Sequence, residues 1–309
     1  MTHATWLVVE PFETGDGPDQ MGRDDALAER AACDVASVAD SAPLRLRFYG
    51  WAPPTLSLGY FQRVEDLRAD PRWRGKPWVR RPSGGGAIWH HADLTYALAV
   101  PPSHPLARQP RRATRLVHEA TRDWLNQLGW NARLHEQTME ASRNAPHAPA
   151  VDPEPPKPFL CFLDRDPVDV VVLGPARDQG GVAVDMEMKS ESESESKSES
   201  GLSRPAKVLG SAQRRRGRAL LQHGSLLLTT AAPANELVGL ADLPRQSAAV
   251  RVADAPAGFA PESWVCPWAR RLAEALEARL EWREPEPEER ERGRVLSEVY
   301  RNPAWLFKR

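Results

Sequence analysis

The sequence contains few cysteines, and they are poorly placed to act together. Cys33, Cys161 and Cys266 are the only three, and long stretches of chain separate them. An odd number at such spacing excludes a disulfide framework and a Cys-x-x-Cys metal site. We therefore expect a reduced, cytoplasmic protein without a bound metal.

An excess of charge of either sign is also lacking, as is any long apolar run. The 41 Lys and Arg residues nearly balance the 42 Asp and Glu residues, which gives a net charge of −1. No apolar run reaches the ~18 residues of a membrane-spanning helix, and the first residues do not match a secretory signal. We therefore expect neither nucleic acid nor a membrane as a partner.

Short apolar segments, several of them alternating, and longer segments with helical spacing share the chain. Strands are predicted in W-L-V-V-E near the start and from Leu44, Thr55 and Thr95. Helices are predicted from an N-cap at Asp19, from Ala113 to Leu128 with Gly129 as the stop, and along Trp268, Leu272, Leu276 and Leu280. This mixture predicts an α+β fold with a mixed, largely antiparallel sheet and flanking helices.

Two segments are not expected to join the core. Residues 138–158 are rich in proline and predict a loop, and residues 176–205 include the Ser/Glu run Met188–Gly201, which we expect to be disordered. The polar segment from Glu284 is expected to begin as a loop and turn helical. Strand-like segments on both sides of the insertions need each other, so we predict one domain, residues 1–309.

Three consecutive glycines, Gly84 to Gly86, follow the strand-like W-V-R-R and precede His90. Glycine lets the backbone adopt positive φ and approach a ligand closely. A phosphate-binding loop would continue into Gly-Lys-Ser/Thr and a helix N-terminus, and this stretch does neither. On these residues alone, a turn without a ligand and a ligand-binding loop are equal alternatives.

Two other residues stand out by their setting. Cys161, in P-F-L-C-F-L-D, lies between Leu and Phe, a setting more typical of a buried apolar residue than of a nucleophile. Lys207 is one of six lysines against 35 arginines, and it lies on an apolar strand. Lysine can lose its proton when desolvated and is a compact donor, whereas arginine is neither. A surface lysine with an extended side chain is the alternative.

The polar residues after Lys207 give weaker signals. The Q-R-R-R-G-R run is short and has no interleaved aromatics, which does not favour a nucleic-acid site. His223 and Ser225 follow in Q-H-G-S, but no acid lies at a spacing known from a Ser-His-Asp triad.

Together these stretches resemble the lipoate/biotin protein ligase and octanoyltransferase superfamily. R-R-P-S-G-G-G-A-I-W-H is similar to its glycine-rich signature, and K-V-L-G-S-A-Q-R-R-R-G-R-A-L-L-Q-H-G-S-L-L-L is similar to its lysine motif. L-R-F-Y-G-W-A-P-P-T-L-S-L-G-Y-F-Q, D-L-T-Y-A-L and the terminal V-Y-R-N-P-A-W-L-F-K-R add to the resemblance. It covers nearly the whole chain outside the insertions and implies the superfamily's single catalytic domain.

Two chemistries compete within this superfamily. Lipoate–protein ligases activate free lipoate with ATP and need the lysine and the glycine loop, but no catalytic cysteine. Octanoyltransferases of the cysteine type take octanoate from a thioester and hold it on a cysteine just before the strand that leads to the lysine motif, often as Cys-Phe. Cys161-Phe162 occupies that place here, and D-L-T-Y-A-L-A-V-P is also more similar to the transferases.

The resemblance therefore implies an octanoyltransferase that needs no cofactor. It gives Cys161 as the nucleophile and Lys207 as the group that stabilises the thiolate, positions the carbonyl and passes on the proton of the incoming amine. Donors from the glycine loop or from Gly210-Ser211-Ala212 are expected to bind the oxyanion. The implied substrate-binding residues are Arg81, Ser83, Gly84, Gly85, Gly86, His90, Gly210, Ser211, Gln213, His223, Gly224 and Ser225. For His90, a structural role in capping the loop is an equal alternative.

The implied donor is octanoyl-acyl carrier protein. The implied acceptor is a lipoyl-carrier protein, either the glycine cleavage H protein or the E2 lipoyl domain of a 2-oxoacid dehydrogenase. Alternatives are ATP-dependent lipoate ligation, octanoyl transfer between carrier domains, and carrier binding without catalysis. Two features depart from the transferase pattern. Gly-Gly-Gly replaces the usual Gly-Gly-Arg, and a long insert separates Val172 from Lys207.

Overall fold

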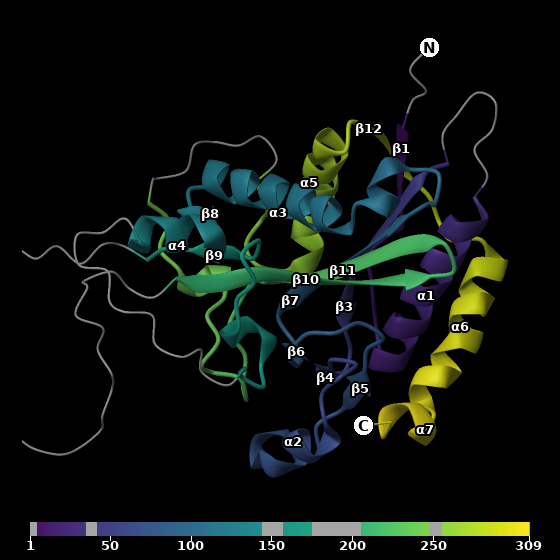
Figure 1. The fold of residues 1–309 in the computed structure, drawn as a ribbon, viewed down its shortest axis with the longest axis horizontal. Coiled ribbons are helices and arrows are strands. Elements are labelled where there is room, and N and C mark those ends of the chain that lie inside the picture. The colour runs from purple at the N-terminus through teal and green to yellow at the C-terminus, as the bar shows by residue number, and fades with distance from the viewer. Residues whose placement is uncertain (1–4, 35–41, 144–156, 175–204, 247–254, 309) are drawn as a thin grey trace, which may run out of the picture.

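The computed structural model of the protein describes residues 5–34, 42–143, 157–174, 205–246 and 255–308. In these ranges, helices cover both faces of a large central sheet (Figure 1). Most of the two predicted insertions, including the whole Ser/Glu run, lies outside the described residues.

The main sheet of the described residues has the strand order β12-β1-β3-β7-β11-β10-β9-β8, with β2 paired beside β3. Its pairs from β3 through β8 are antiparallel, whereas β12, β1, β2 and β3 pair in parallel. The strands are β1 (Thr5–Val9), β2 (Glu13–Gly15), β3 (Leu44–Trp51), β7 (Asp93–Val100), β8 (Ala132–Leu134), β9 (Val170–Val172), β10 (Ala206–Arg216), β11 (Ala219–Leu227) and β12 (Ala278–Trp282). The predicted α+β class with a mixed, largely antiparallel sheet is confirmed.

A smaller sheet carries the glycine run. Its order is β5-β4-β6, and Gly84 to Gly86 lie in the connection from β5 to β6. The strands are β4 (Thr55–Leu58), β5 (Trp78–Arg80) and β6 (Ile88–His90). This sheet therefore holds both ends of the glycine loop.

Helices α3 and α5 cover one face of the main sheet, and α1 covers the other with α6 packed against it (Figure 1). Strand β7 shows why both faces are covered, because its side chains alternate. Leu94, Tyr96 and Leu98 join the cluster under α3 and α5, whereas Ala97 and Ala99 join the cluster under α1. The helices are α1 (Gly17–Cys33), α2 (Val64–Ala69), α3 (Pro110–Gln127), α4 (His135–Arg143), α5 (Pro261–Ala275), α6 (Pro287–Arg301) and α7 (Pro303–Leu306).

Four predicted boundaries were wrong. Helix α3 starts at Pro110 and not at Ala113, because proline suits the first position of a helix. Helix α1 starts earlier than predicted, because Asp16 is the N-cap and accepts from the Asp19 amide. Helix α5 ends at Ala275, and Glu277 with φ 51° turns the chain so that Leu280 lies in β12. Residues 138–143, predicted as loop, complete α4, since the first proline of that segment comes only at Pro146. Gly129 ends α3 with φ 98°, as predicted, and the segment from Glu284 turns helical in α6.

The Q-R-R-R-G-R run forms the end of the β10–β11 hairpin. Arg216 contacts Glu29 at 2.7 Å, Arg214 approaches Asp25 at 3.7 Å, and Arg215 donates to a backbone carbonyl. Acidic side chains of α1 therefore neutralise part of the run, which agrees with the expectation that it is not a nucleic-acid site.

His118 on α3 is a fully buried histidine between two polar partners. Its Nδ1 lies 2.6 Å from the Val168 carbonyl oxygen and its Nε2 lies 2.6 Å from the Ser211 hydroxyl. Burial lowers the pKa of His118, and the hydrogen bond to Val168 and the charge of Asp169, which act in the opposite direction, do not outweigh it. Nδ1 faces an acceptor, so it carries the proton and Nε2 accepts.

This burial predicts a loss of stability in acid. The unfolded chain protonates histidine below about pH 6.5, whereas buried His118, whose pKa is lowered, takes up its proton only at a lower pH. Unfolding therefore takes up a proton, and the free energy of unfolding falls as pH falls. His118→Asn should flatten this dependence between pH 7 and 5, and His91→Asn, at an exposed position, should leave it unchanged. Denaturant unfolding at several pH values checks this. Equal slopes for the three proteins would contradict it.

Candidate active site

Cys161 and Lys207 lie in contact, although 45 residues of sequence, most of them outside the described ranges, separate them. The Lys207 Nζ is 3.6 Å from the Cys161 Sγ. The long insert that departs from the family pattern therefore leaves this contact in place.

The Lys207 ammonium is buried and tightly held. It lies 2.7 Å from an Asp169 carboxylate oxygen, and it donates to the carbonyls of Cys161 and Asp164 at 3.1 Å each. Burial alone would lower the pKa of Lys207, but the Cys161 thiolate and the Asp169 carboxylate outweigh it and raise that pKa. Lys207 is therefore a fixed positive charge beside the sulfur, and it is poorly suited to take up a proton.

A β-bulge in β10 and a neighbouring glycine determine where the Lys207 side chain lies. The pairing of β10 with β9 shifts register between Lys207 and Leu209, and such bulges redirect side chains. Gly210 leaves the space that the lysine occupies, since a Cβ there would lie 2.7 Å from the Lys207 Cε. The glycine of the lysine motif thus makes room for the lysine itself.

The glycine loop packs directly on the segment that carries Cys161. Ala87 accepts from the Cys161 amide and donates to the Phe159 carbonyl, both at 2.8 Å. A Cβ at Gly86 would lie 2.9 Å from the Cys161 nitrogen, so only glycine permits this approach. Gly85, with φ 92°, needs glycine for its backbone conformation.

Arg81 binds the carbonyl groups of the glycine loop. Its guanidinium donates to the Gly84 and Gly86 carbonyls at 2.8 and 2.6 Å, and to the Ser57 carbonyl at 2.9 Å. Within the described ranges it has no carboxylate partner. Burial lowers the pKa of Arg81 to about 10, so the side chain remains a cation at neutral pH. This leaves a buried positive charge available to an anion in the pocket.

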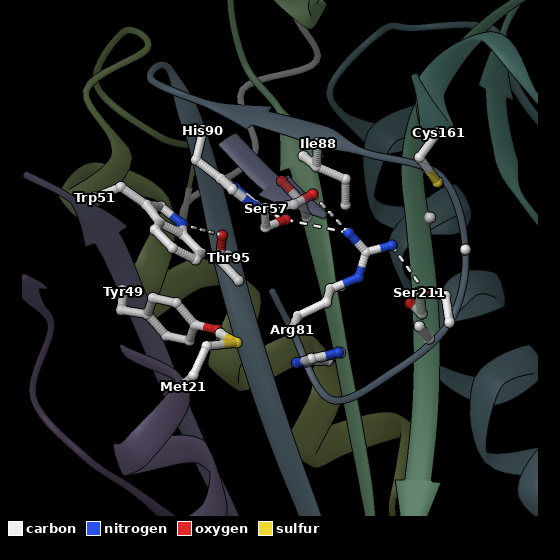
Figure 2. A pocket seen from close by; sticks show the side chains of 17 residues that line it. Met21, Tyr49, Trp51, Ser57, Arg81, Ile88, His90, Thr95, Cys161 and Ser211 are labelled. Carbon is white, nitrogen blue, oxygen red and sulfur yellow. Dashed lines mark hydrogen bonds between the residues drawn. The ribbon is translucent and has the colours of Figure 1, made fainter. Parts of the chain in front are cut away.

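A pocket runs from Cys161 across the sheet toward α1 (Figure 2). The end at Cys161 is open, since Gly85 is exposed and Cys161 and Gly84 are half-buried. At the other end, Met21, Tyr49 and Trp51 are buried. The predicted residues that line it are Arg81, Gly84, Gly85, His90, Cys161, Gly210, Ser211, His223, Gly224 and Ser225.

His90 is a fixed part of the pocket wall. Its ring stacks on Trp51 at 3.9 Å, its Nδ1 is 2.8 Å from Asp93, and its Nε2 is 2.9 Å from the Ser57 hydroxyl. Burial lowers the pKa of His90 despite Asp93. Burial would raise the pKa of Asp93, but hydrogen bonds from His90, Ser225 and Thr95 lower it. His90 is therefore held in the pocket wall by three partners, Trp51, Asp93 and Ser57.

His223 has an acidic partner that the sequence did not reveal. Its Nε2 is hydrogen-bonded to the Ser83 hydroxyl, and its Nδ1 is 3.2 Å from Asp24 on α1. Ser83 is buried and does not line the pocket, and Asp24 also accepts from Arg47 and Tyr49. This chain ties α1 to β11 and the glycine loop, and its serine lies outside the pocket that contains Cys161.

For two residues the structure differs from the sequence-based prediction. Gln213 does not line the pocket, because its amide donates to Gln222 and to the Pro110 carbonyl near α3. Asp169 was missed, although a carboxylate within the apolar V-D-V-V-V-L is the same signal that singled out Lys207. Met21 carried no signal, and Tyr49 lay in a stretch that added to the resemblance without being singled out.

Comparison with known proteins identifies the family. A family model described as the lipoyl protein ligase A/B catalytic domain matches residues 19–241. The chain belongs to this family. That membership confirms the superfamily that the sequence motifs indicate.

Named relatives of this lipoyl protein ligase A/B domain are octanoyltransferases. The octanoyltransferase LipM of Geobacillus kaustophilus is 33% identical over 190 residues, which are 60% of this chain and 54% of that protein. The octanoyltransferase LipM of Kyrpidia tusciae is 29% identical over 308 residues, or 93% of this chain and 97% of that protein. The first alignment thus spans about half of the relative.

Solved structures of lipoate–protein ligases share the fold. Lipoate-protein ligase A bound with ATP superposes with a TM-score of 0.58 and 17% identity, over 99% of each chain. The bi-partite lipoate protein ligase of Thermoplasma acidophilum, solved as part of a lipoylation system with its E2 lipoyl domain, gives 0.56 and 17%, over 99% of this chain and 97% of that one. At such identity these matches establish the fold alone.

The described ranges contain neither a candidate metal cluster nor a candidate membrane-spanning helix. No group of three or more His, Cys, Asp or Glu side chains there is arranged to hold a metal ion. No helix in the same ranges is long and apolar enough to cross a membrane.

The packing of the glycine loop on Cys161 predicts unequal effects of two neighbouring substitutions. Gly86→Ala forces a methyl group against the Cys161 backbone and should cost about 1–3 kcal/mol of unfolding free energy. Gly84→Ala is the matched control, because its Cβ would meet only the Phe61 ring at an ordinary 3.6 Å. It should change stability by no more than ~0.5 kcal/mol. Denaturant unfolding measures both, and equal losses would contradict the described packing.

Proposed function

We propose that the protein is an octanoyltransferase that moves an octanoyl group from the thioester of an acyl carrier protein, through Cys161, to a lysine of a lipoyl-carrier protein. The observation that carries the proposal is the 3.6 Å contact between the Cys161 Sγ and the Lys207 Nζ at the open end of an apolar pocket. A thiol beside a fixed ammonium suits thioester exchange. The named octanoyltransferase relatives support the same activity.

In the first step, the Cys161 thiolate attacks the carbonyl carbon of the octanoyl thioester. A new C–S bond forms to Sγ, the bond to the carrier's thiol breaks, and the departing thiolate takes a proton from solvent. Lys207 stabilises the attacking thiolate through its charge, and the Asp169 carboxylate holds the Lys207 side chain in place. The donor is already activated as a thioester, so this step needs no ATP.

In the second step, the neutral amine of the acceptor lysine attacks the thioester on Cys161. The C–N bond forms, the C–S bond breaks, and Cys161 leaves as a thiolate beside the Lys207 ammonium. The amine gives its proton to solvent. Because the pKa of Lys207 is raised, this account departs from the sequence-based prediction that Lys207 also passes on that proton.

Both steps develop negative charge on the carbonyl oxygen. Arg81 lines the pocket as a cation without a carboxylate partner in the described ranges. The backbone N–H groups of Gly84 and Gly85 also donate to no acceptor within those ranges. The Gly84 and Gly85 N–H groups are the donors that we assign to the oxyanion, and Arg81 stabilises it through its charge, because the terminal N–H groups of Arg81 already donate to the Ser57, Gly84 and Gly86 oxygens.

The two carriers are assigned on different grounds. A T. acidophilum lipoate protein ligase has been solved as part of a system with its E2 lipoyl domain, which supports a lipoyl domain as acceptor here. Acyl carrier protein is proposed as donor because it presents acyl groups as thioesters. A free cysteine nucleophile requires a reducing compartment, so the proposal places the reaction in the cytoplasm.

Transfer of octanoate to a purified lipoyl domain tests the proposal. With octanoyl-acyl carrier protein and no ATP, the protein should octanoylate the domain, and Cys161→Ala should abolish this because no acyl group can be held. Cys33→Ala and Cys266→Ala, at exposed positions on α1 and α5, should retain the wild-type rate. Mass spectrometry of the lipoyl domain gives the readout.

The alternatives give different results in the same assay. Modification that requires ATP and free lipoate, and that survives Cys161→Ala, would identify a ligase instead. Cysteine-dependent transfer only from an octanoylated carrier domain would identify an amidotransferase. No modification under any condition would contradict all three catalytic assignments and leave carrier binding alone.

A further inference from the structure

The closed end of the pocket is built by three side chains from two elements. Met21 comes from α1, and Tyr49 and Trp51 come from β3; all three line the pocket and are at most 7% exposed. Figure 2 shows them at the end away from Cys161. A chain attached to Cys161 and lying in this pocket would therefore meet these side chains with its last carbons.

Two of the three side chains are fixed by hydrogen bonds. The Tyr49 hydroxyl donates to Asp24 at 2.9 Å, and the Trp51 indole donates to Thr95 at 2.8 Å while stacking on His90. Their positions belong to the buried polar network that joins α1 to the sheet. A change at either would leave a buried polar group without its partner, which is costly.

Met21 differs from both neighbours. It makes no hydrogen bond in the described structure, and its unbranched thioether fills space that no polar group needs. The helix that carries it is nevertheless held in place, because adjacent Gln20 donates to the Gly50 carbonyl at 2.8 Å. The volume of the residue at position 21 can therefore change the depth of the pocket while the walls stay in place.

From these observations we infer that Met21 sets the length of acyl chain that the protein accepts, acting as the floor of the pocket opposite Cys161. The inference rests on the proposed function, since it concerns the acyl group that Cys161 receives. A smaller residue would deepen the pocket, and a larger one would shorten it. In an apolar pocket, one extra or missing methylene changes the preference between two substrates by roughly 10- to 200-fold.

A ladder of donors tests this. Acyl carrier protein is loaded with hexanoyl, octanoyl, decanoyl or dodecanoyl groups, and the initial rate of acyl adduct formation on the enzyme is followed by intact-protein mass spectrometry. Wild type should be fastest with octanoyl. Met21→Ala should raise the decanoyl-to-octanoyl rate ratio at least tenfold, and Met21→Phe should raise the hexanoyl-to-octanoyl ratio by a similar factor.

Leu27→Ala is the matched control. Leu27 lies on the same helix and in the same buried cluster as Met21, but it does not line the pocket. Its substitution should destabilise the protein comparably while leaving the order of donor preference unchanged. This separates a change of pocket depth from a general loss of packing.

The possible outcomes separate failure of the inference about Met21 from failure of the proposed function. If wild type forms an adduct and both Met21 variants keep its profile, the inference is overturned and the proposed function stands. If wild type forms no adduct with any donor, the proposed function fails, and this inference fails with it. If Leu27→Ala shifts the profile as Met21→Ala does, the floor is not specific to Met21.

Discussion

The buried ammonium of Lys207 is the group on which the arrangement of the site depends. It contacts the Asp169 carboxylate, two backbone carbonyls and the Cys161 sulfur. A single cation thus joins β10, the residue just before β9 and the turn that bears the thiol. A buried charge is tolerated only when it is paired and hydrogen-bonded. Here the partners that satisfy the charge also fix its distance to the Cys161 sulfur.

Two glycines provide the space that this arrangement needs. Gly210 leaves room for the lysine, and Gly86 lets the loop pack on the Cys161 backbone. Arg81 then gathers the loop carbonyls and places a second cation in the same pocket. The glycine run, which lacks the continuation of a phosphate loop, thus serves close backbone packing around a thiol.

Residue patterns predicted the parts of this site that lie within motifs. The structure brings Cys161, Lys207 and most of the glycine-loop residues together, and the mixed sheet followed from the spacing of apolar residues. The rest depends on contacts between segments far apart in the chain. Asp24 reaches His223 from α1, and Met21 meets the pocket from the same helix, so neither has a signal in local spacing.

The central claim is that Cys161 carries the acyl group, and intact-protein mass spectrometry after mixing with octanoyl-acyl carrier protein tests it most directly. The account predicts one octanoyl adduct that hydroxylamine removes and that peptide mapping places on Cys161, with Cys33 and Cys266 unmodified. An adduct that resists hydroxylamine, or one that persists in Cys161→Ala, would contradict the account.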